Sequence, residues 1–361
     1  MQIGILKESG DRRVALVPKG IEKLQQDGLQ FLLESGAGAT ANFSDADYPD
    51  TIQILSRAEV LQQADLLISI HPLSEQELKG LAADKTLVAL FEPYNQTEVV
   101  SQLAALQLQA FSLDMIPRTT LAQSMDILSS MASIAGYKAV LLAANTTPRY
   151  FPMMITAAGS VKPAQVLVLG AGVAGLQAIA TAKRMGAVVE AFDVRAAAKE
   201  EVKSLGAKFV EVEGAAEDQD AGGYAVEQSE DFLRRQREAV QQSAAKSDVV
   251  ITTAQVRGRK APTLVTADTV AKMKPGSVIV DLAASTGGNC ELTENNKTIV
   301  AHEVTIIGDS NLAASLPQDA SVLFSNNLVN FLKLIIQEGE LVIDLENEIV
   351  KSALISPPQS A

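Results

Sequence analysis

A glycine-rich turn between two apolar segments constrains the fold of this chain more than any other feature. The stretch from Val166 to Arg195 reads as a strand, a tight turn, a helix and a second strand that ends at an acidic residue. Its glycines follow the spacing G-x-G-x-x-G, and Asp193 lies roughly 20 residues after the last of them. This order of elements predicts a Rossmann-type unit that binds a dinucleotide.

Each glycine has a physical role in holding the dinucleotide. Gly170 permits the sharp turn out of the strand, Gly172 has no Cβ to block a pyrophosphate, and Gly175 lets the helix pack closely on the sheet. The first turn of that helix offers free N–H groups and a partial positive charge to phosphate. The sequence therefore assigns cofactor binding to Gly170, Gly172, Val173, Ala174 and Gly175.

Asp193 also bears on which dinucleotide is bound. Its carboxylate is expected to accept hydrogen bonds from the adenosine ribose hydroxyls and to repel a 2′-phosphate, which favours NAD over NADP. Arg195 argues the other way, because a nearby arginine can bind that phosphate. A carboxylate held against the ribose should outweigh a flexible neighbour, so the prediction is NAD.

Length and composition predict two α/β domains. The chain has 361 residues, is 47% hydrophobic and carries a formal charge of −13, which excludes nucleic acid as a partner. Its single cysteine, Cys290, excludes a disulfide framework and is interpreted as a structural residue in a reducing compartment. We assign no metal ligands. We find no signal peptide and no apolar run of about 18 residues, so we expect a soluble chain.

The pattern of elements predicts a discontinuous first domain. Five short strands, IGILKE, FLLES, DLLISIH, TLVALF and LQAFSLDMI, alternate in the first third with helices near 18–28, 55–63, 74–82 and 95–107. A helix from about Ser124 to Ala144 follows. A second α/β set runs from Val166 to about Gly308, and the apolar tail is expected to be helical, without strands, and to return to the first domain. We therefore expect an N-terminal domain of 1–125 plus 320–361, a linking helix at 126–145, and an NAD-binding domain at 146–319.

Two polar segments are candidates for function. The acidic stretch at about 213–237, with Gly-Gly-Tyr at 222–224, is interpreted as a mobile lid, the alternative being a disordered insertion. The stretch from Arg118 to Ser129 brings Arg118, Gln123, Ser124, Asp126 and Ser129 together before a helix. It is either a nicotinamide-facing loop with a partly buried Arg118–Asp126 pair, or a helix cap made by Ser124 or Asp126.

Long segments of the chain resemble one family. The segments RTTLAQSMD, IAGYKAV, FPMMITAAGSV, DVRAA, AGGYA, DLAASTGGN and LFSNNLVNFL, with the glycine turn, are similar to the NAD-binding subunit (domain I, within the alpha subunit) of proton-translocating nicotinamide nucleotide transhydrogenase. That subunit belongs to the alanine dehydrogenase/transhydrogenase superfamily. The resemblance implies two Rossmann-like domains with parallel sheets and NAD(H) in the cleft between them.

The resemblance also implies site residues. The nicotinamide end would be held by Arg118, Gln123, Asp126 and Ser129. The adenosine end would be held by Asp193, Val194 and Arg195, and the cleft would be lined by Gly223, Tyr224, Gln236 and Gln255. The chain departs from the family at Leu121, often a second arginine, and at QVRGRK (255–260), usually more apolar.

The resemblance further implies how the protein works. Hydride would pass between NADH here and NADP⁺ on a partner subunit, coupled to proton translocation by a membrane-embedded subunit. The class would be the Si-specific/Re-specific NAD(P)⁺ transhydrogenase, active only with its partners. A homodimer is expected, held at the cytoplasmic face of a membrane through the other subunits.

Two alternatives stay open. Alanine dehydrogenase shares the architecture and needs an acid/base near the reacting carbon, supplied in that family by a lysine and a histidine. This chain has His71 where that lysine is expected and no histidine in LFEPYNQ, and His302 lies late in the second domain. Arg13 could hold a carboxylate but equally could cap a turn or pair with Glu8. The other alternative is an NAD-binding protein without turnover.

Overall fold

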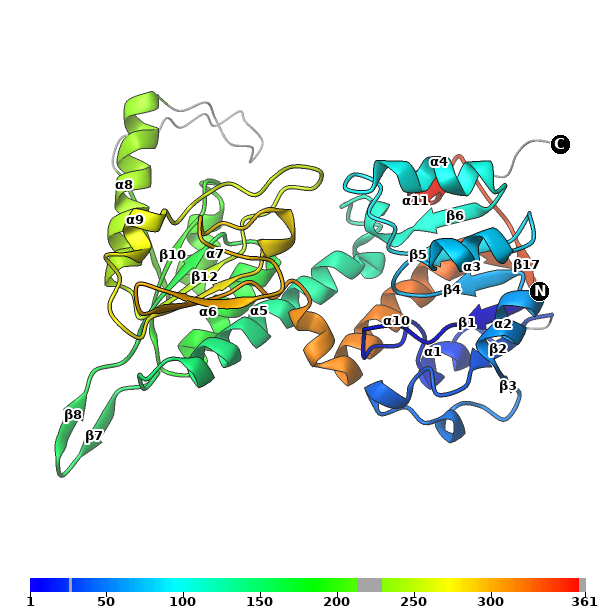
Figure 1. Cartoon of the computed structure of the whole chain (residues 1–361), viewed down its shortest axis with the longest axis horizontal. Coiled ribbons are helices and arrows are strands. Elements are labelled where there is room, and N and C mark those ends of the chain that lie inside the picture. Colours follow the sequence, from blue (N-terminus) through cyan, green and yellow to red (C-terminus); the bar gives the residue numbers. More distant parts are fainter. Residues whose placement is uncertain (26–27, 213–228, 357–361) are drawn as a thin grey trace. The chain divides into compact units, whose positions relative to one another are not determined.

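The structure, a computed structural model, describes residues 1–25, 28–212 and 229–356 (Figure 1). These residues form two compact units, one made of Met1–Met131 with Ala313–Ala361 and the other of Ala132–Leu312. Each unit contains a seven-stranded, mainly parallel sheet flanked by helices. The predicted fold class, α/β with two Rossmann-like domains, is confirmed.

The sheet of the first unit contains all five strands predicted in the first third of the chain. Its strand order is β18-β6-β5-β4-β1-β2-β3, and every neighbouring pair is parallel except β18 with β6. The strands are β1 (Gln2–Ile5), β2 (Gln30–Glu34), β3 (Gln53–Leu55), β4 (Leu66–Ile68), β5 (Thr86–Ala89), β6 (Gln109–Ser112) and β18 (Leu354–Ser356). Both β3 and β18 are three-residue edge strands, too short for a periodic pattern to show in the sequence.

Short helices connect these strands. They are α1 (Pro18–Glu22), α2 (Arg57–Gln63), α3 (Glu75–Gly80) and α4 (Thr97–Ala105). Capping boxes fix where two of them begin: Ser56 pairs with Glu59 at the start of α2, and Ser74 pairs with Glu77 at the start of α3. The helix predicted over 18–28 is shorter than expected, since α1 ends at Glu22 with Lys23 as its C-cap.

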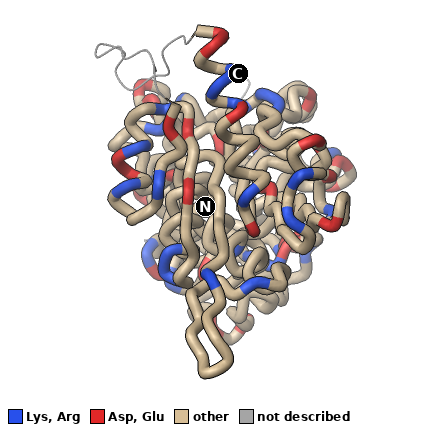
Figure 2. The backbone as a smooth tube through the Cα atoms, turned by 90° about the vertical axis from the view of Figure 1, so that its left-hand side faces the viewer, with Lys and Arg blue, Asp and Glu red and all other residues tan. Residues whose placement is uncertain are grey.

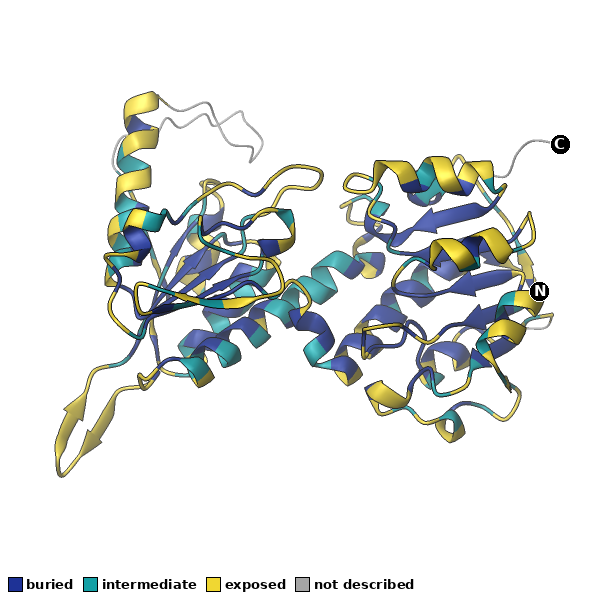
Figure 3. Cartoon of the chain, in the orientation of Figure 1, coloured by how far each residue is buried: buried dark blue, intermediate teal, exposed yellow. Residues whose placement is uncertain are grey.

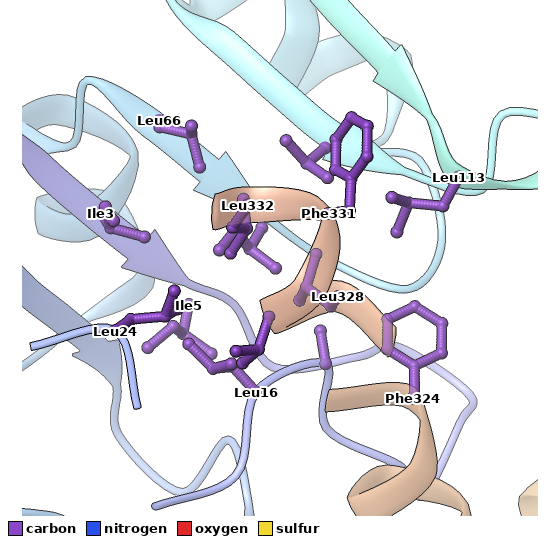
Figure 4. Packing of buried hydrophobic residues seen from close by; sticks show 14 of the residues in the cluster. Ile3, Ile5, Leu16, Leu24, Leu66, Leu113, Phe324, Leu328, Phe331 and Leu332 are labelled. Carbon is purple, nitrogen blue, oxygen red and sulfur yellow. The ribbon is translucent and has the colours of Figure 1, made fainter. Parts of the chain in front are cut away.

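The C-terminal tail supplies much of the core of the first unit. Helix α10 (Pro317–Ile335) places Phe324, Leu328, Phe331 and Leu332, all fully buried, among residues of β1 and the loops beside it (Figure 4). Phe331 meets Phe111 of β6 edge to face, with ring centroids 5.6 Å apart. The prediction that the tail has no strands is wrong: after α10 come β16 (Ile336–Gln337), β17 (Glu340–Leu341), α11 (Glu348–Ala353) and β18.

The sheet of the second unit has the order β11-β10-β9-β12-β13-β15-β14. Its strands are β9 (Gln165–Leu169), β10 (Val188–Phe192), β11 (Lys208–Phe209), β12 (Val249–Thr252), β13 (Val278–Asp281), β14 (Thr298–Ala301) and β15 (Val304–Ile307). Only β14 runs antiparallel, as an edge strand that the sequence reading missed. The strand order reverses between β9 and β12, and ligands of open α/β sheets bind at such a switch point.

In the described part of this unit, helices connect the strands from β9 to β13. They are α6 (Val173–Arg184), α7 (Ala198–Ser204), α8 (Glu230–Lys246) and α9 (Ala267–Val270). The predicted mobile loop at 213–237 is wrong in its last third, since α8 starts at Glu230 with Ser229 as its N-cap. Ion pairs of Asp231 with Arg234 and Arg235 support that first turn. The rest of the predicted lid lies outside the described residues.

The predicted helix that leads from the first unit into the second is present as α5 (Ile127–Thr146). It is long and apolar enough to cross a membrane by length and composition, with a mean hydropathy of 1.5, so the expectation of no such segment is wrong on this test. A buried core helix passes the same test, and 39% of its apolar window is buried (Figure 3). The segment was overlooked because Ser, Gly and Ala interrupt its larger apolar residues.

A β-hairpin projects from the second unit (Figure 1). It consists of β7 (Met154–Thr156) and β8 (Gly159–Val161), paired antiparallel, and every residue of both strands is exposed (Figure 3). Ile155 is 76% exposed and Met153, just before β7, is 58% exposed. The hairpin was not predicted, and its segment FPMMITAAGSV was used only as a resemblance.

Candidate functional site

The glycine turn follows the carboxyl end of β9 and bends the chain sharply. Two of its positions, Gly170 and Gly175, leave no room for a side chain. Gly170 has a φ of +101°, and a Cβ there would lie 2.6 Å from the Thr253 Oγ1. A Cβ on Gly175 would lie 1.8 Å from the carbonyl oxygen of Gly170, so the helix touches the turn directly. Both glycines therefore have the steric roles that the sequence predicts.

Gly172 is different, because nothing lies within 4 Å of a Cβ added there. Gly172 is the N-cap of α6, and no side chain caps the helix at this end. Val173 and Ala174 form the first helical turn, and the carbonyl of Ala174 packs against Gly136 of α5. A helix start with uncapped N–H groups and open space above a glycine fits a bound phosphate.

Asp193 follows β10 at the same edge of the sheet as the turn. Its Oδ2 accepts a hydrogen bond from the backbone N–H of Ala171 at 2.7 Å, and its side chain is 9% exposed. Oδ1 accepts from the backbone N–H and Nε of Arg195, at 2.8 and 3.0 Å, and Arg195 Nη2 donates to Oδ2 at 3.1 Å. The structure thus joins the acid to the glycine turn through one residue of that turn.

The ionisation of Asp193 is set by opposing effects. Burial disfavours the charged carboxylate, but the hydrogen bonds from Arg195 and Ala171 outweigh it and hold the pKa of Asp193 below its usual range. Arg195, taken in the sequence as a flexible neighbour, is engaged in hydrogen bonds in the structure. The guanidinium is bound to Asp193, and its Nη2 also donates to the carbonyl of Ala171 at 3.1 Å.

Three residues that support this edge escaped the sequence reading. Thr253, after β12, donates its hydroxyl to the carbonyl of Gly170 at 3.1 Å. Asn289 is fully buried and holds both backbone groups of Ala254, accepting from the N–H and donating to the carbonyl. Asp281 in turn accepts the N–H of Asn289 at 2.7 Å. The signal for Asp281 and Asn289 was the segment DLAASTGGN, which begins at the last residue of β13 and was used only as a resemblance.

The remaining residues assigned to the second unit are more dispersed. Val194 is 65% exposed beside Asp193, and Gln236 is half-buried in the middle of α8. Gln255 is exposed and donates to the hydroxyl of Thr286 at 3.1 Å, next to the segment that Asn289 anchors. Gly223 and Tyr224 lie outside the described residues.

The loop from Arg118 to Ser129 belongs to the first unit. Asp126 accepts from the N–H and hydroxyl of Ser129, at 2.9 and 2.6 Å, directly before α5 begins. This is the helix-cap interpretation, made by Asp126 and not by Ser124. The predicted Arg118–Asp126 pair is not among the ion pairs of the described residues, because both oxygens of Asp126 face Ser129 while Arg118 lies exposed on the loop.

Arg118 and Gln123 are exposed and carry side-chain N–H donors, and the hydroxyl residues Thr119, Thr120 and Ser124 of this loop are exposed as well. The backbone of the loop is fixed by α10, since the side-chain amide of Asn327 in that helix donates to the carbonyl of Ser124 at 2.7 Å. Leu121, where the sequence departs from the family, is 84% exposed between Arg118 and Gln123. The loop therefore presents exposed hydrogen-bond donors while its backbone is held in place by α10.

A second cluster of titratable groups lies near the start of the first unit. Arg13 is 4% exposed and pairs with Asp11, not with Glu8 as one alternative held. His71 Nε2 lies 2.9 Å from the same carboxylate, and Glu8 accepts the backbone N–H groups of Ile70 and His71. In the ranges that the structure describes, no group of three acidic, His or Cys side chains is placed to hold a metal ion.

Several pKa values in this cluster are shifted. The hydrogen bond to Asp11 raises the pKa of His71, and burial raises that of Glu8. Burial also opposes ionisation of Asp11, but the hydrogen bonds from His71 and Arg13 outweigh burial and lower its pKa strongly. Arg13 and His71 are thus tied to one ionised carboxylate.

Two mainly parallel sheets, one opening on a glycine turn with an acid at the next strand end, define a two-domain α/β protein of the Rossmann type. Comparison with known families narrows this class. The alanine dehydrogenase/PNT N-terminal domain matches residues 4–135, and the C-terminal domain of the same family matches residues 139–357. The chain belongs to the alanine dehydrogenase/PNT family, and the resemblance inferred from the sequence is confirmed.

Individual relatives agree with this assignment. The chain is 44% identical to the first part of NAD(P) transhydrogenase subunit alpha of Rhodospirillum rubrum, over 99% of this chain and 96% of that protein. A crystal structure of transhydrogenase from Sinorhizobium meliloti matches with a TM-score of 0.90 at 41% identity, over 99% of both chains. Alanine dehydrogenase of Mycolicibacterium smegmatis is 26% identical over 94% of this chain and 88% of that enzyme.

Proposed function

We propose that this chain is the NAD(H)-binding component of a proton-translocating NAD(P)⁺ transhydrogenase of the Si-specific/Re-specific class. The observation that carries the proposal is Asp193, hydrogen-bonded to the N–H of Ala171 inside the glycine turn and close to the open Gly172. The relatives named NAD(P) transhydrogenase subunit alpha support the choice of reaction.

The second unit would hold the adenosine and pyrophosphate parts of the cofactor. Gly172 and the N–H groups at the start of α6 would bind the pyrophosphate, and Asp193 would accept the ribose hydroxyls. Val194, Gln236 and Gln255, with Gly223 and Tyr224, are proposed as further contacts. NADH, when bound, supplies the hydride.

The loop from Arg118 to Ser129 is proposed to bind the nicotinamide end. Arg118 and Gln123 carry the exposed donors, suited to the amide and ribose oxygens there. Asp126 and Ser129 act by fixing the start of α5 through their two hydrogen bonds. Orientation of the ring in this way is what direct transfer between two nicotinamides requires, since no proton moves at the reacting carbons.

The second candidate, an amino-acid dehydrogenase, needs an acid/base and a free group to bind the substrate carboxylate. The two residues considered for those tasks, His71 and Arg13, are both bonded to the Asp11 carboxylate. Arg13 is buried, with 4% of its surface exposed, and its guanidinium is engaged in the ion pair with Asp11. This arrangement favours the transhydrogenase proposal.

Partner subunits complete the proposed activity. NADP(H) would be bound by a second subunit, and proton movement would occur in a membrane-embedded subunit. The chain would lie at the cytoplasmic face of the membrane, held there by these partners. Its formal charge of −13 leaves little attraction to anionic lipid, which is consistent with attachment through proteins.

We also propose a homodimer, with the β7–β8 hairpin as the element that joins two copies. A two-stranded hairpin has little stability alone, and this one exposes Met153, Ile155 and Val161. Residues 150–161 contain no charged side chain, as Figure 2 shows for the projecting arm. Two acidic chains can approach at such an uncharged surface without repulsion.

Ile155→Asp should convert the dimer to a monomer in light scattering; an unchanged dimer contradicts this role of the hairpin.

The NAD(H) proposal is tested by binding of NADH and NADPH to the purified chain, followed through NADH fluorescence. Gly172→Ala should fold normally and lose NADH affinity by about ten-fold or more, because the new methyl group faces the phosphate. Gly80→Ala is the matched control, since a Cβ there also meets nothing within 4 Å. Equal affinity for NADH and NADPH contradicts the assignment.

The reaction is tested by adding the NADP-binding subunit and following NADH-driven reduction of an NADP⁺ analogue. We expect reduction only when both proteins are present. Alanine-dependent reduction of NAD⁺ by the chain alone would instead establish the amino-acid dehydrogenase. Tight NADH binding without activity beside any partner would identify a non-catalytic binder.

A further inference from the structure

We propose that the guanidinium of Arg195 competes with the adenosine ribose for Asp193, so that NAD(H) binds by displacing this side chain. The inference rests on the proposed function, because it concerns the ribose end of the same site. It makes Arg195 a determinant of affinity and specificity that acts against the bound cofactor.

The argument begins with the acceptor capacity of the carboxylate. Each oxygen of an ionised carboxylate accepts about two hydrogen bonds. Oδ1 receives the backbone N–H and Nε of Arg195, and Oδ2 receives the N–H of Ala171 and Nη2 of Arg195. All four positions are filled by the protein, and two of the four donors belong to the guanidinium.

A ribose with two hydroxyl donors needs two of these positions. The backbone N–H groups of Ala171 and Arg195 are fixed by the glycine turn and by the end of β10, so they cannot leave without unfolding the site. The guanidinium can leave, because the Arg195 side chain is 45% exposed, against 9% for Asp193. Release of the guanidinium into water is therefore the least costly way to admit the ribose.

The position of the guanidinium strengthens the argument. Nη2 donates to the carbonyl of Ala171 as well as to Asp193, so the side chain reaches from the end of β10 to the glycine turn. The guanidinium therefore lies where the adenosine ribose of a dinucleotide would approach the glycine turn. Glu201, in α7, is the other acidic group whose charge acts on Arg195, and it favours the charged guanidinium after release.

Specificity follows from the same pair. A 2′-phosphate attracts a guanidinium, but Asp193 holds this guanidinium in a planar, multiply bonded arrangement that a phosphate must break. NADP(H) thus meets both a repelling carboxylate and an arginine already engaged. The presence of Arg195 two residues after Asp193 consequently does not imply NADP binding.

The test is the affinity for NADH of wild type, Arg195→Ala, Arg195→Lys and a control, Arg184→Ala, measured by fluorescence titration at low and high salt. Arg184 is an exposed arginine at the far end of α6, so its loss removes the same charge from the same unit. We expect R195A to bind NADH about two- to five-fold more tightly, the range open to half-exposed ion pairs, and R184A to match wild type.

Salt provides the second readout. Because salt screens the Asp193–Arg195 pair, rising salt should weaken NADH binding less in wild type than in R195A. Unchanged or weaker NADH binding by R195A overturns the inference. If R195K then matches wild type, the positive charge at residue 195 helps to bind a phosphate of NADH. A wild-type chain that binds no NADH overturns the proposed function itself.

Discussion

Two Asp-x-Arg pairs of nearly the same geometry occur in this protein, one in each unit. Asp11 accepts from the N–H and Nε of Arg13 at 2.9 and 3.1 Å, and Asp193 accepts from the same atoms of Arg195 at 2.8 and 3.0 Å. Their surroundings differ. The first pair is 1% and 4% exposed, whereas the second is 9% and 45% exposed.

The comparison shows that burial, not geometry, decides what such a pair can do. A buried pair must stay closed, since opening it leaves a charge without water or partner. A pair with an exposed arginine can open at small cost, so its carboxylate is available to a ligand. The pair of the first unit is therefore structural, and the pair of the second unit is suited to binding.

The largest expected effect is the loss of the buried arginine. Arg13→Met should lower the free energy of unfolding of the first unit by about 3–5 kcal/mol, because the buried charge of Asp11 loses its guanidinium partner and keeps only the half-exposed His71 beside it. Urea unfolding measures this. The double variant Asp11→Asn with Arg13→Met should lose less than Arg13→Met alone, and a larger loss would contradict the account.

Next in size is the effect of the exposed pair on binding. Asp193→Asn should weaken NADH binding by about ten- to hundred-fold, since hydrogen bonds to a charged acceptor are the strong ones. The NADPH affinity should fall less or rise, as Arg195 becomes free for the 2′-phosphate. Equilibrium titration with both nucleotides checks this, and equal losses for the two would refute it.

The half-exposed histidine of the buried cluster should give a smaller, pH-dependent effect. The pKa of His71 is raised by Asp11, so protonation stabilises the folded state fully below its ordinary value of 6.5 and this contribution is lost as pH rises through the raised value. His71→Gln should remove that dependence, at a cost of roughly 1 kcal/mol at low pH. Urea midpoints at pH 6 and pH 9 measure it, and an unchanged pH dependence would exclude His71 as its source.

The smallest effect is expected for Arg195→Ala on stability. Because the guanidinium is 45% exposed, the loss should stay below about 1 kcal/mol. Thermal unfolding of this variant beside Arg13→Met compares the two pairs directly. Similar losses in both variants would remove the distinction between the buried and the exposed pair.

The sequence predicted the parts of this protein that depend on local pattern. The glycine turn, the strands β9, β10, β12 and β13, and the helix α5 all follow from apolar periodicity and from glycine sterics. The strands β3, β14 and β18 did not, because each is a short edge strand held by its neighbour.

The site shows the same division. Asp193 could be predicted, since its spacing from the glycines defines it. The bonding of Arg195 to Asp193 could not, because a sequence does not show which rotamer a side chain adopts. Asn289 was missed for another reason: its amide reaches Ala254 and Pro262 from a turn far along the chain, a contact that only the tertiary fold creates.

The contribution of α10 to the core of the first unit has a consequence for how the chain is synthesised. The second unit is one continuous stretch, whereas the first unit takes Phe324, Phe331 and its edge strand β18 from the end of the chain. On the ribosome, the segment made first must therefore wait with an incomplete core until the segment made last has emerged. The middle of the chain can fold in the meantime.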